Sequence, residues 1–181
     1  MKWMKGVMLM GFVTALIGCS GGGSGALMHY KDAEPKLVLE DFFDGTIKGW
    51  GMIQDSSGKV TRRFDVEIIA SWDGDNGILD ETFVFYDGET DKRIWKVKKI
   101  DDRNYVGTAG DIIGEATGEQ EGNALRWAYQ MDLTVDGRTF RMTFDDWMYL
   151  MNDGVLINRS YIKKFGITFA ELTLFMQKQD S

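Results

Sequence analysis

ALRWAYQMDLTV (residues 124–135), the turn Asp136-Gly137 and RTFRMTFDDWMYL (residues 138–150) form the stretch that decides the fold. In the first half every second residue from Leu125 onward is large and apolar, and the residues between them, beginning with Arg126, are mostly polar or small. A period of two predicts a β-strand with one buried face. Asp-Gly is typical of the tight turns that join antiparallel strands. The stretch therefore predicts a β-hairpin.

The same pattern continues on both sides of this hairpin. Only one helix is predicted, a short one within Leu37–Phe43 (LVLEDFF), with Gly45 just beyond its end. Short segments rich in Asp, Asn and Gly separate the candidate strands. These strands run over residues 46–55, 60–72, 78–86, 91–100, 104–109, 114–120, 124–135, 138–150, 155–164 and 167–177.

Strands with one apolar face must bury that face together. They do so either by closing into a barrel or by packing two sheets against each other. Strands in simple up-and-down order favour closure, which also removes exposed edges. We therefore predict an all-β, antiparallel, up-and-down barrel of about 8–10 strands, with a β-sandwich as the alternative. A small barrel of this kind can enclose one ligand.

The composition describes one folded domain and excludes several kinds of site. The chain has 181 residues, of which 44% are hydrophobic and 13% aromatic, enough for a sizeable core. One Cys and one His exclude an internal disulfide, a Cys-rich metal site and a multi-His zinc site within a monomer. No phosphate-binding loop, nucleophile elbow or dinucleotide fingerprint occurs in the sequence. We therefore expect no cofactor, no metal and no catalytic residue.

The N-terminal segment resembles the signal of bacterial lipoproteins. Met1–Lys5 carries two lysines, an apolar run of twelve residues follows (GVMLMGFVTALI), and Gly18 precedes Cys19, the only Cys of the chain. The apolar run is too short to cross a membrane as a helix. The resemblance implies cleavage before Cys19, thioether lipidation of its thiol, and acylation of its new amino group, for example by palmitate.

This signal divides the chain into three parts. Residues 1–18 are the signal peptide, residues 19–36 are the lipidated Cys and a flexible tether that begins SGGGSG, and residues 37–178 are the barrel domain. Several acyl chains on one residue suffice for stable membrane attachment. Ser20, in place of an Asp, implies sorting to the outer membrane. We therefore expect a lipid-anchored outer-membrane protein that faces the periplasm.

The net charge of the mature chain restricts the classes of partner that it is expected to bind. Without Lys2 and Lys5 it keeps 19 basic against 28 acidic residues, a net charge of −9. Nucleic-acid binding requires a basic face, so we expect no nucleic-acid partner. The expected partners are the membrane, through the anchor, together with an apolar ligand or an envelope protein.

A series of short motifs runs through the barrel domain. It includes Gly49-Trp50-Gly51, Arg62-Arg63-Phe64, Leu79–Phe83 (LDETF), Asp111–Gly118 (DIIGEATG), Asp145–Leu150 (DDWMYL), Asn158-Arg159 and Lys164-Phe165-Gly166. Together with the signal, these motifs resemble a family of bacterial lipoproteins known only as a domain of unknown function, over about residues 37–178. The resemblance implies a lipocalin-like barrel. It also implies a connection to lipids, because members are often encoded near fatty-acid-modifying enzymes.

Four ionisable residues lie on apolar strand faces, and three of them, Asp146, Glu81 and Arg159, are candidate ligand-binding residues. Asp146, Glu81, Arg159 and Glu171 each share the parity of apolar neighbours along their strands. A buried charge is costly unless a partner, water or a ligand satisfies it. Trp127 and Tyr129 join these candidates, because aromatic walls suit an apolar cavity.

We expect Asp146 and Arg159 to form an ion pair inside the barrel or near its open end. A two-residue turn at Asn152-Asp153 would place them directly opposite each other, and one at Asp153-Gly154 would make them diagonal neighbours. A three-residue loop would instead put them on opposite faces. The pair fixes the strand register, leaves Arg159 to hold an anionic headgroup, or faces the solution.

Three other features favour ordinary structural roles. The acidic segment Asp73–Gly77 predicts a hairpin turn, because a calcium loop would need a Glu where the chain has Val84. The basic segment Lys92–Lys99 predicts a hydrated outer strand, with an anionic-lipid site as the alternative. Adjacent carboxylates such as Asp145-Asp146 are weak evidence for an enzyme among 28 acidic residues. The leading prediction is a protein that binds a fatty acid, a lipid or another apolar molecule, and the alternative is a solid barrel that docks an envelope protein.

Overall fold

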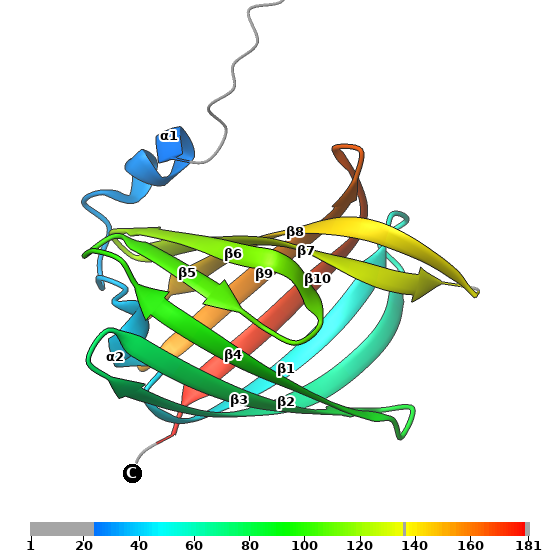
Figure 1. Cartoon of the computed structure of the whole chain (residues 1–181), viewed down its shortest axis with the longest axis horizontal. Coiled ribbons are helices and arrows are strands. Elements are labelled where there is room, and N and C mark those ends of the chain that lie inside the picture. Colours follow the sequence, from blue (N-terminus) through cyan, green and yellow to red (C-terminus); the bar gives the residue numbers. More distant parts are fainter. Residues whose placement is uncertain (1–23, 136, 180–181) are drawn as a thin grey trace, which may run out of the picture.

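The computed structural model describes residues 24–135 and 137–179 (Figure 1). Its helical elements are short: α1 (Ser24–Leu27), the 3-10 turn η1 (Met28–Tyr30) and α2 (Leu39–Phe42). In this part of the chain no helix is long and apolar enough to cross a membrane. Cys19 and the signal segment lie outside the described residues.

Ten antiparallel strands follow, and each lies within two residues of a predicted one. They are β1 (Gly45–Asp55), β2 (Val60–Asp73), β3 (Asn76–Phe85), β4 (Thr90–Lys99), β5 (Asn104–Thr108), β6 (Ile112–Glu121), β7 (Ala124–Val135), β8 (Arg138–Leu150), β9 (Val155–Lys164) and β10 (Ile167–Lys178). The predicted short helix is confirmed as α2, which lies inside the predicted segment.

The strands close into an up-and-down barrel. Each strand pairs with its neighbours in the sequence, and β1 pairs with β10 to complete the ring, with Trp50 opposite Phe175. The barrel prediction is therefore confirmed, and the β-sandwich alternative is wrong. Closure follows from the strand pattern, because strands with one apolar face leave no edge or face unpaired in a closed ring.

Helix α2 closes one end of the barrel, on the left in Figure 1. Its residues Leu39 and Phe42 are buried, as is the adjacent Phe43. The indole nitrogen Nε1 of Trp72 donates a hydrogen bond to the carbonyl oxygen of Phe43 at 2.8 Å. The backbone N–H of Leu39 donates to Oε1 of Gln120 at 3.1 Å. Apolar burial and these two hydrogen bonds hold α2 in the end of the barrel.

The segment before α2 differs from the expected flexible tether. Leu27 is fully buried, and the backbone N–H of Leu37 donates to the carbonyl oxygen of Gly122 at 2.8 Å. A side chain on Gly122 would come within 1.6 Å of the carbonyl oxygen of Tyr30. The chain before α2 therefore contacts the barrel at Leu27, Tyr30 and Leu37. The sequence pattern missed this because a single buried Leu has no periodicity.

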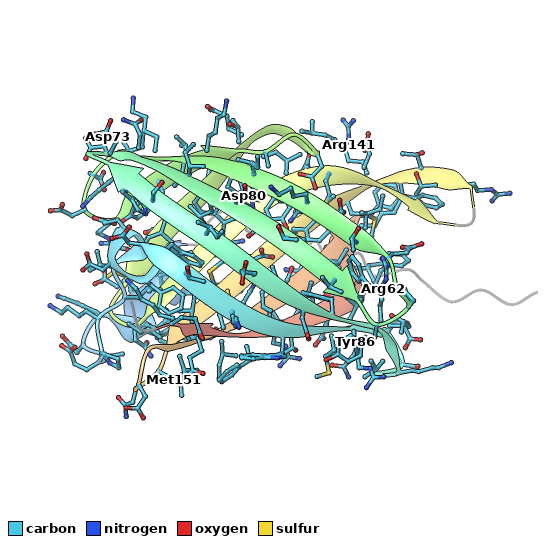
Figure 2. The ribbon with its side chains drawn as sticks, turned by 90° about the horizontal axis from the view of Figure 1, so that it is seen from below. Arg62, Asp73, Asp80, Tyr86, Arg141 and Met151 are labelled. Atoms are coloured by element: carbon cyan, nitrogen blue, oxygen red, sulfur yellow. The ribbon has the colours of Figure 1, made fainter. Side chains whose placement is uncertain are left out.

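Ion pairs between neighbouring strands cover much of the outside. Figure 2 shows the side chains of Asp80 and Arg141 directed away from the barrel. Asp80 pairs with Lys92 at 3.0 Å, and Arg141 pairs with Asp132 at 3.1 Å. The polar positions of these strands thus face outward, and the apolar positions that alternate with them face the interior.

Candidate functional site

A cavity of about 310 Å³ lies inside the barrel. This volume falls within the roughly 300–1,000 Å³ typical of small-molecule sites. Most of its lining is apolar, including Phe43, Ile68, Phe83, Leu125, Phe144 and Leu172. The barrel is therefore hollow, which the sequence alone did not decide.

The cavity extends to the end of the barrel opposite α2. There it is lined by Ile53, Arg62, Phe85 and Leu133, which stand near the strand ends and are only partly buried. Arg62 is held at this rim by Asp87, at 2.9 Å, and by Glu89. We call this the open end, because α2 plugs the other one.

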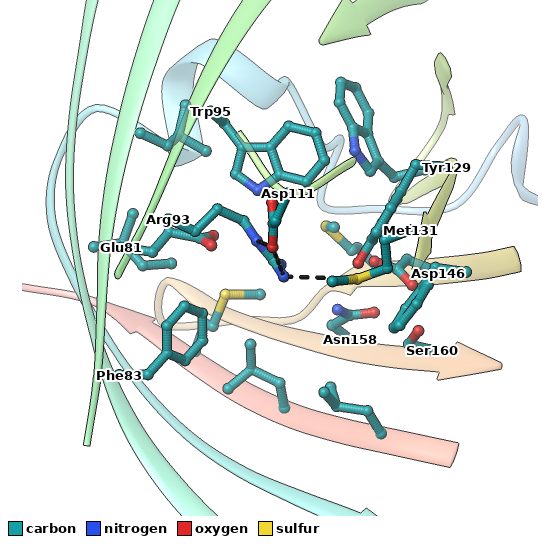
Figure 3. Close-up of a pocket in the computed structure, with 18 of the residues that line it drawn as sticks. Glu81, Phe83, Arg93, Trp95, Asp111, Tyr129, Met131, Asp146, Asn158 and Ser160 are labelled. Carbon is teal, nitrogen blue, oxygen red and sulfur yellow. Dashed lines mark hydrogen bonds and ion pairs between the residues drawn. The ribbon is translucent and has the colours of Figure 1, made fainter. Parts of the chain in front are cut away.

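Polar side chains gather midway along the cavity, as Figure 3 shows. They come from β3, β4, the β5–β6 turn, β7, β8 and β9, so the closed barrel alone brings them together. We call them the central polar cluster. Its members are Glu81, Arg93, Asp111, Tyr129, Asp146, Asn158 and Ser160.

Arg93 and Asp111 form an ion pair on one wall of this cluster. Both Nε and Nη2 of Arg93 donate to Oδ2 of Asp111, at 2.8 and 2.7 Å. The sulfur of Met131 on β7 lies 3.9 Å from the same Nη2. Glu81 is the cross-strand neighbour of Arg93 and also faces inward. This ion pair satisfies much of the guanidinium without a ligand.

The Arg93–Asp111 pair also spans a thin part of the wall. The short strand β5 pairs with β4 only from Lys96 to Lys99, so within the described residues the first half of β4 has no strand partner on that side. The contacts of Arg93 with Asp111 and Met131 bridge this stretch (Figure 3). A basic residue that the sequence assigned to a hydrated strand is thus part of the cavity wall.

Asp146, Asn158 and Ser160 form the other wall. Asp146 on β8 stands opposite Ser160 on β9, and Asn158 is one inward position away on the same strand. Their exposed fractions are only 6%, 6% and 2%. The atoms Oδ1 of Asp146, Oδ1 of Asn158 and Oγ of Ser160 have no hydrogen-bond partner among the described residues. Such buried, unsatisfied oxygens are uncommon and require an explanation.

Burial changes the acidity of two carboxyl groups in the cluster. Desolvation raises the pKa of Asp146 to about 7. Desolvation likewise raises the pKa of Glu81 to about 7, although the nearby Arg93 opposes the shift. Removing a carboxylate from water disfavours its charged form. Near neutral pH both the ionised and the neutral form of each carboxyl group are therefore populated.

Aromatic rings cover the cavity wall beside the cluster. The rings of Trp95 and Trp127 meet edge to face at 5.7 Å, and Tyr129 stacks on Phe144 at 4.8 Å. The indole of Trp127 lies over a glycine, because a side chain on Gly118 would come within 2.3 Å of it. Glycine at this position therefore makes room for the ring.

Four of the five predicted ligand-binding residues line this cavity: Glu81, Trp127, Tyr129 and Asp146. The fifth, Arg159, does not. Its prediction as the partner of Asp146 is wrong, because Arg159 pairs across the strands with Trp147, whereas Asp146 pairs with Ser160. Three residues connect the paired ends Met151 and Val155, so the loop puts the two side chains on opposite faces.

Arg159 lies on the outside, where it forms an ion pair with Glu171. Glu171 was also expected on an apolar, inward face of its strand. Its apolar neighbours Phe169 and Phe175 are in fact outward and exposed, at 50% and 37%. On β10 the apolar parity therefore marks the outer face as well, and parity alone could not orient the strand.

The remaining sequence predictions concern metals. Asp73 ends β2 and Asn76 begins β3, so the acidic segment is a hairpin turn as predicted. Among the residues that the structure describes, no group of three or more His, Cys, Asp or Glu side chains is placed to hold a metal ion.

The sequence missed Arg93, Asp111, Asn158 and Ser160 as cavity residues. Arg93 shares its parity with Trp95 and Val97, which was a usable signal for an inward position. On β9 the residues Asn158 and Ser160 alternate with the more apolar residues Val155, Ile157 and Tyr161. The sequence pattern therefore predicts the wrong inner face for this strand. Asp111 lies in a turn, where parity gives no information.

Comparison with known proteins places the chain in a family. No curated protein matches it significantly. A family model described as a protein of unknown function, DUF3833, matches residues 13–178. The match includes every strand of the barrel and every residue of the central polar cluster. The chain therefore belongs to the DUF3833 family.

Proposed function

We propose that this protein is a non-enzymatic, lipid-anchored protein of the outer membrane, facing the periplasm, that binds a fatty acid, a lipid or another long apolar molecule inside its barrel. The observation that carries the proposal is the apolar cavity of about 310 Å³ with one open end and a central polar cluster. The lipoprotein-like signal that ends at Cys19 supports the location.

The cavity matches the chemistry of an amphiphile. Each methylene group moved from water into the apolar lining contributes about 0.8 kcal/mol, so a long chain offsets the cost of its own ordering. The central polar cluster supplies a second point of recognition, because a polar end group would meet hydrogen-bonding partners instead of hydrocarbon. A molecule with an apolar chain and one polar group satisfies both parts of the site.

The test is native mass spectrometry of the full chain, purified from the envelope of its own host. The protein is released with a detergent whose mass identifies it if it enters the barrel. We expect a bound species of defined mass that solvent extraction recovers as a lipid. A ligand-free mass that persists after incubation with host lipids contradicts the proposal and favours an envelope-docking role, to be pursued by crosslinking.

A pair of variants ties the bound species to the cavity. Leu79→Trp adds an indole to the cavity lining and should reduce the bound fraction several-fold, because Leu79 is buried and lines the cavity. Ile78→Trp is the matched control, since this neighbour on β3 is 42% exposed and lies on the outer face. Equal retention by both variants would place the species elsewhere on the protein.

A further inference from the structure

We propose that the polar group of the bound molecule is uncharged and carries an O–H bond that donates to an oxygen of Asp146, Asn158 or Ser160. The bound molecule is then a long-chain alcohol or a hydroxyl-bearing lipid such as an acylglycerol, rather than a fatty-acid carboxylate. This inference rests on the proposed binding function and adds the chemical class of the ligand.

The unsatisfied oxygens carry the first step. Oδ1 of Asp146, Oδ1 of Asn158 and Oγ of Ser160 are all buried and all lack a partner among the described residues. The two Oδ1 atoms are acceptors, whereas the Ser160 hydroxyl both accepts and donates, and all three lie on adjacent strands that line the cavity. Leaving buried acceptors unsatisfied costs free energy at each atom. A ligand O–H supplies a donor to these oxygens, whereas an ionised carboxylate supplies none.

The charge of the cluster carries the second step. Three carboxyl groups, those of Glu81, Asp111 and Asp146, stand against the guanidinium of Arg93. Asp111 already holds that guanidinium through two hydrogen bonds. Another anion would either be repelled by ionised Glu81 and Asp146 or force these groups to take up protons, and both cost free energy. The cluster therefore disfavours an anionic headgroup.

The position of the three acceptors carries the third step. They lie midway along the barrel, and apolar lining continues from them toward α2 and toward the open end. An alkyl chain attached to a hydroxyl at Ser160 thus finds hydrocarbon contacts in either direction. No anionic group needs to remain at the open end in water.

The test compares dodecanol with dodecanoate, two probes that share one alkyl chain and differ in the head group. Binding to the full chain is measured by calorimetry at pH 7.5, where dodecanoate is ionised. We expect dodecanol to bind at least about ten-fold more tightly, which corresponds to about 1.4 kcal/mol. Equal affinities, or tighter binding of dodecanoate, overturn the inference but leave the proposed function intact. Binding of neither probe counts against both.

Variants separate recognition of the hydroxyl from general packing. Ser160→Ala removes a hydroxyl and Asn158→Leu removes an amide, and each should lower the affinity for dodecanol several-fold more than the affinity for dodecanoate. Thr173→Val is the matched control, because Thr173 pairs with Arg159 on the outward parity of β10. If Asn158→Leu unfolds, the milder Ser160→Ala still gives the ratio of the two affinities. An unchanged ratio in Ser160→Ala contradicts the assignment of the hydroxyl to this wall.

Discussion

At the scale of single residues, burial decides more than residue type. Asp145 and Asp146 are adjacent in the sequence and both are buried, yet their surroundings are opposite. Asp145 faces the outer side, where Arg126 and Lys163 each bind it at 2.6 Å and hold its pKa below the ordinary value, despite partial burial. Asp146 faces the cavity, where desolvation raises its pKa to about 7. Only the second carboxyl is able to change charge near neutral pH.

We predict that Asp146→Asn stabilises the protein increasingly as the pH rises. The pKa of Asp146 is about 7 in the folded chain against an ordinary 3.8, so the folded state binds the extra proton between these values. Wild-type stability therefore falls as pH rises through this window, at up to about 1.4 kcal/mol per pH unit, and levels off above it. Asparagine removes this contribution.

Urea unfolding of both proteins from pH 4.5 to pH 8 checks this prediction. The charge of Asp146 also raises the pKa of Glu81, so the difference between the two free energies of unfolding includes the altered titration of Glu81. A difference that stays constant across the range would show that Asp146 is ionised, or exposed, in the folded state.

Arg159→Ala gives the opposite prediction, a nearly silent change. The Arg159 side chain is 51% exposed and its only carboxylate partner among the described residues is Glu171, also on the outer face. Exposed ion pairs contribute about 0–1 kcal/mol, so the free energy of unfolding should change by less than that. Calorimetry with dodecanol should give the same affinity for Arg159→Ala as for the wild type. A clear loss of affinity would return Arg159 to the binding site.

At the scale of elements, the hairpin between β9 and β10 carries local strain. Its two-residue turn is Phe165-Gly166, and φ is positive at both positions, 51° and 79°. Turns of this kind favour Asn-Gly, because a bulky side chain fits poorly in the left-handed region. Phe165 is also 92% exposed, so no buried contact offsets this cost.

We predict that Phe165→Asn raises the free energy of unfolding by about 0.5–1 kcal/mol, equivalent to a rise in Tm of about 1–4 °C. Thermal unfolding of the variant tests this value. Phe169→Asn is the control, because Phe169 is exposed on the same hairpin but lies within the strand, where Asn is less favourable than Phe. A loss of stability in Phe165→Asn would mean that the phenyl ring of Phe165 makes a stabilising contact in the folded protein.

Loop length decides register at the same scale. The three-residue loop between β8 and β9 contains Asp153 and Gly154, both with positive φ, of 60° and 66°. The Asp-Gly pair was visible in the sequence, and so was the turn. Whether two or three residues form the loop was not visible. One residue more or less in the loop shifts the register of β9 by one position. This shift decides whether Asn158 or Arg159 faces the cavity.

At the scale of the whole molecule, closure creates the site. The central polar cluster draws on six separate segments of the ring, and no two adjacent strands hold all of its members. Sequence patterns predicted Glu81 and Asp146 as inward charges, because their parity neighbours are strongly apolar. They could not predict the Arg93–Asp111 pair, which joins a strand to a turn, 18 residues apart in the chain.

The sequence by itself determined the ten strands, their order, the turns between them and the inner faces of β2, β3, β7 and β8. It did so because alternation of apolar and polar residues is a local property that each strand carries independently. Only the tertiary structure decided the inner faces of β9 and β10, the register across the β8–β9 loop and the existence of a cavity. These depend on loop length and on how side chains from distant strands fill the ring, and a two-residue period contains neither quantity.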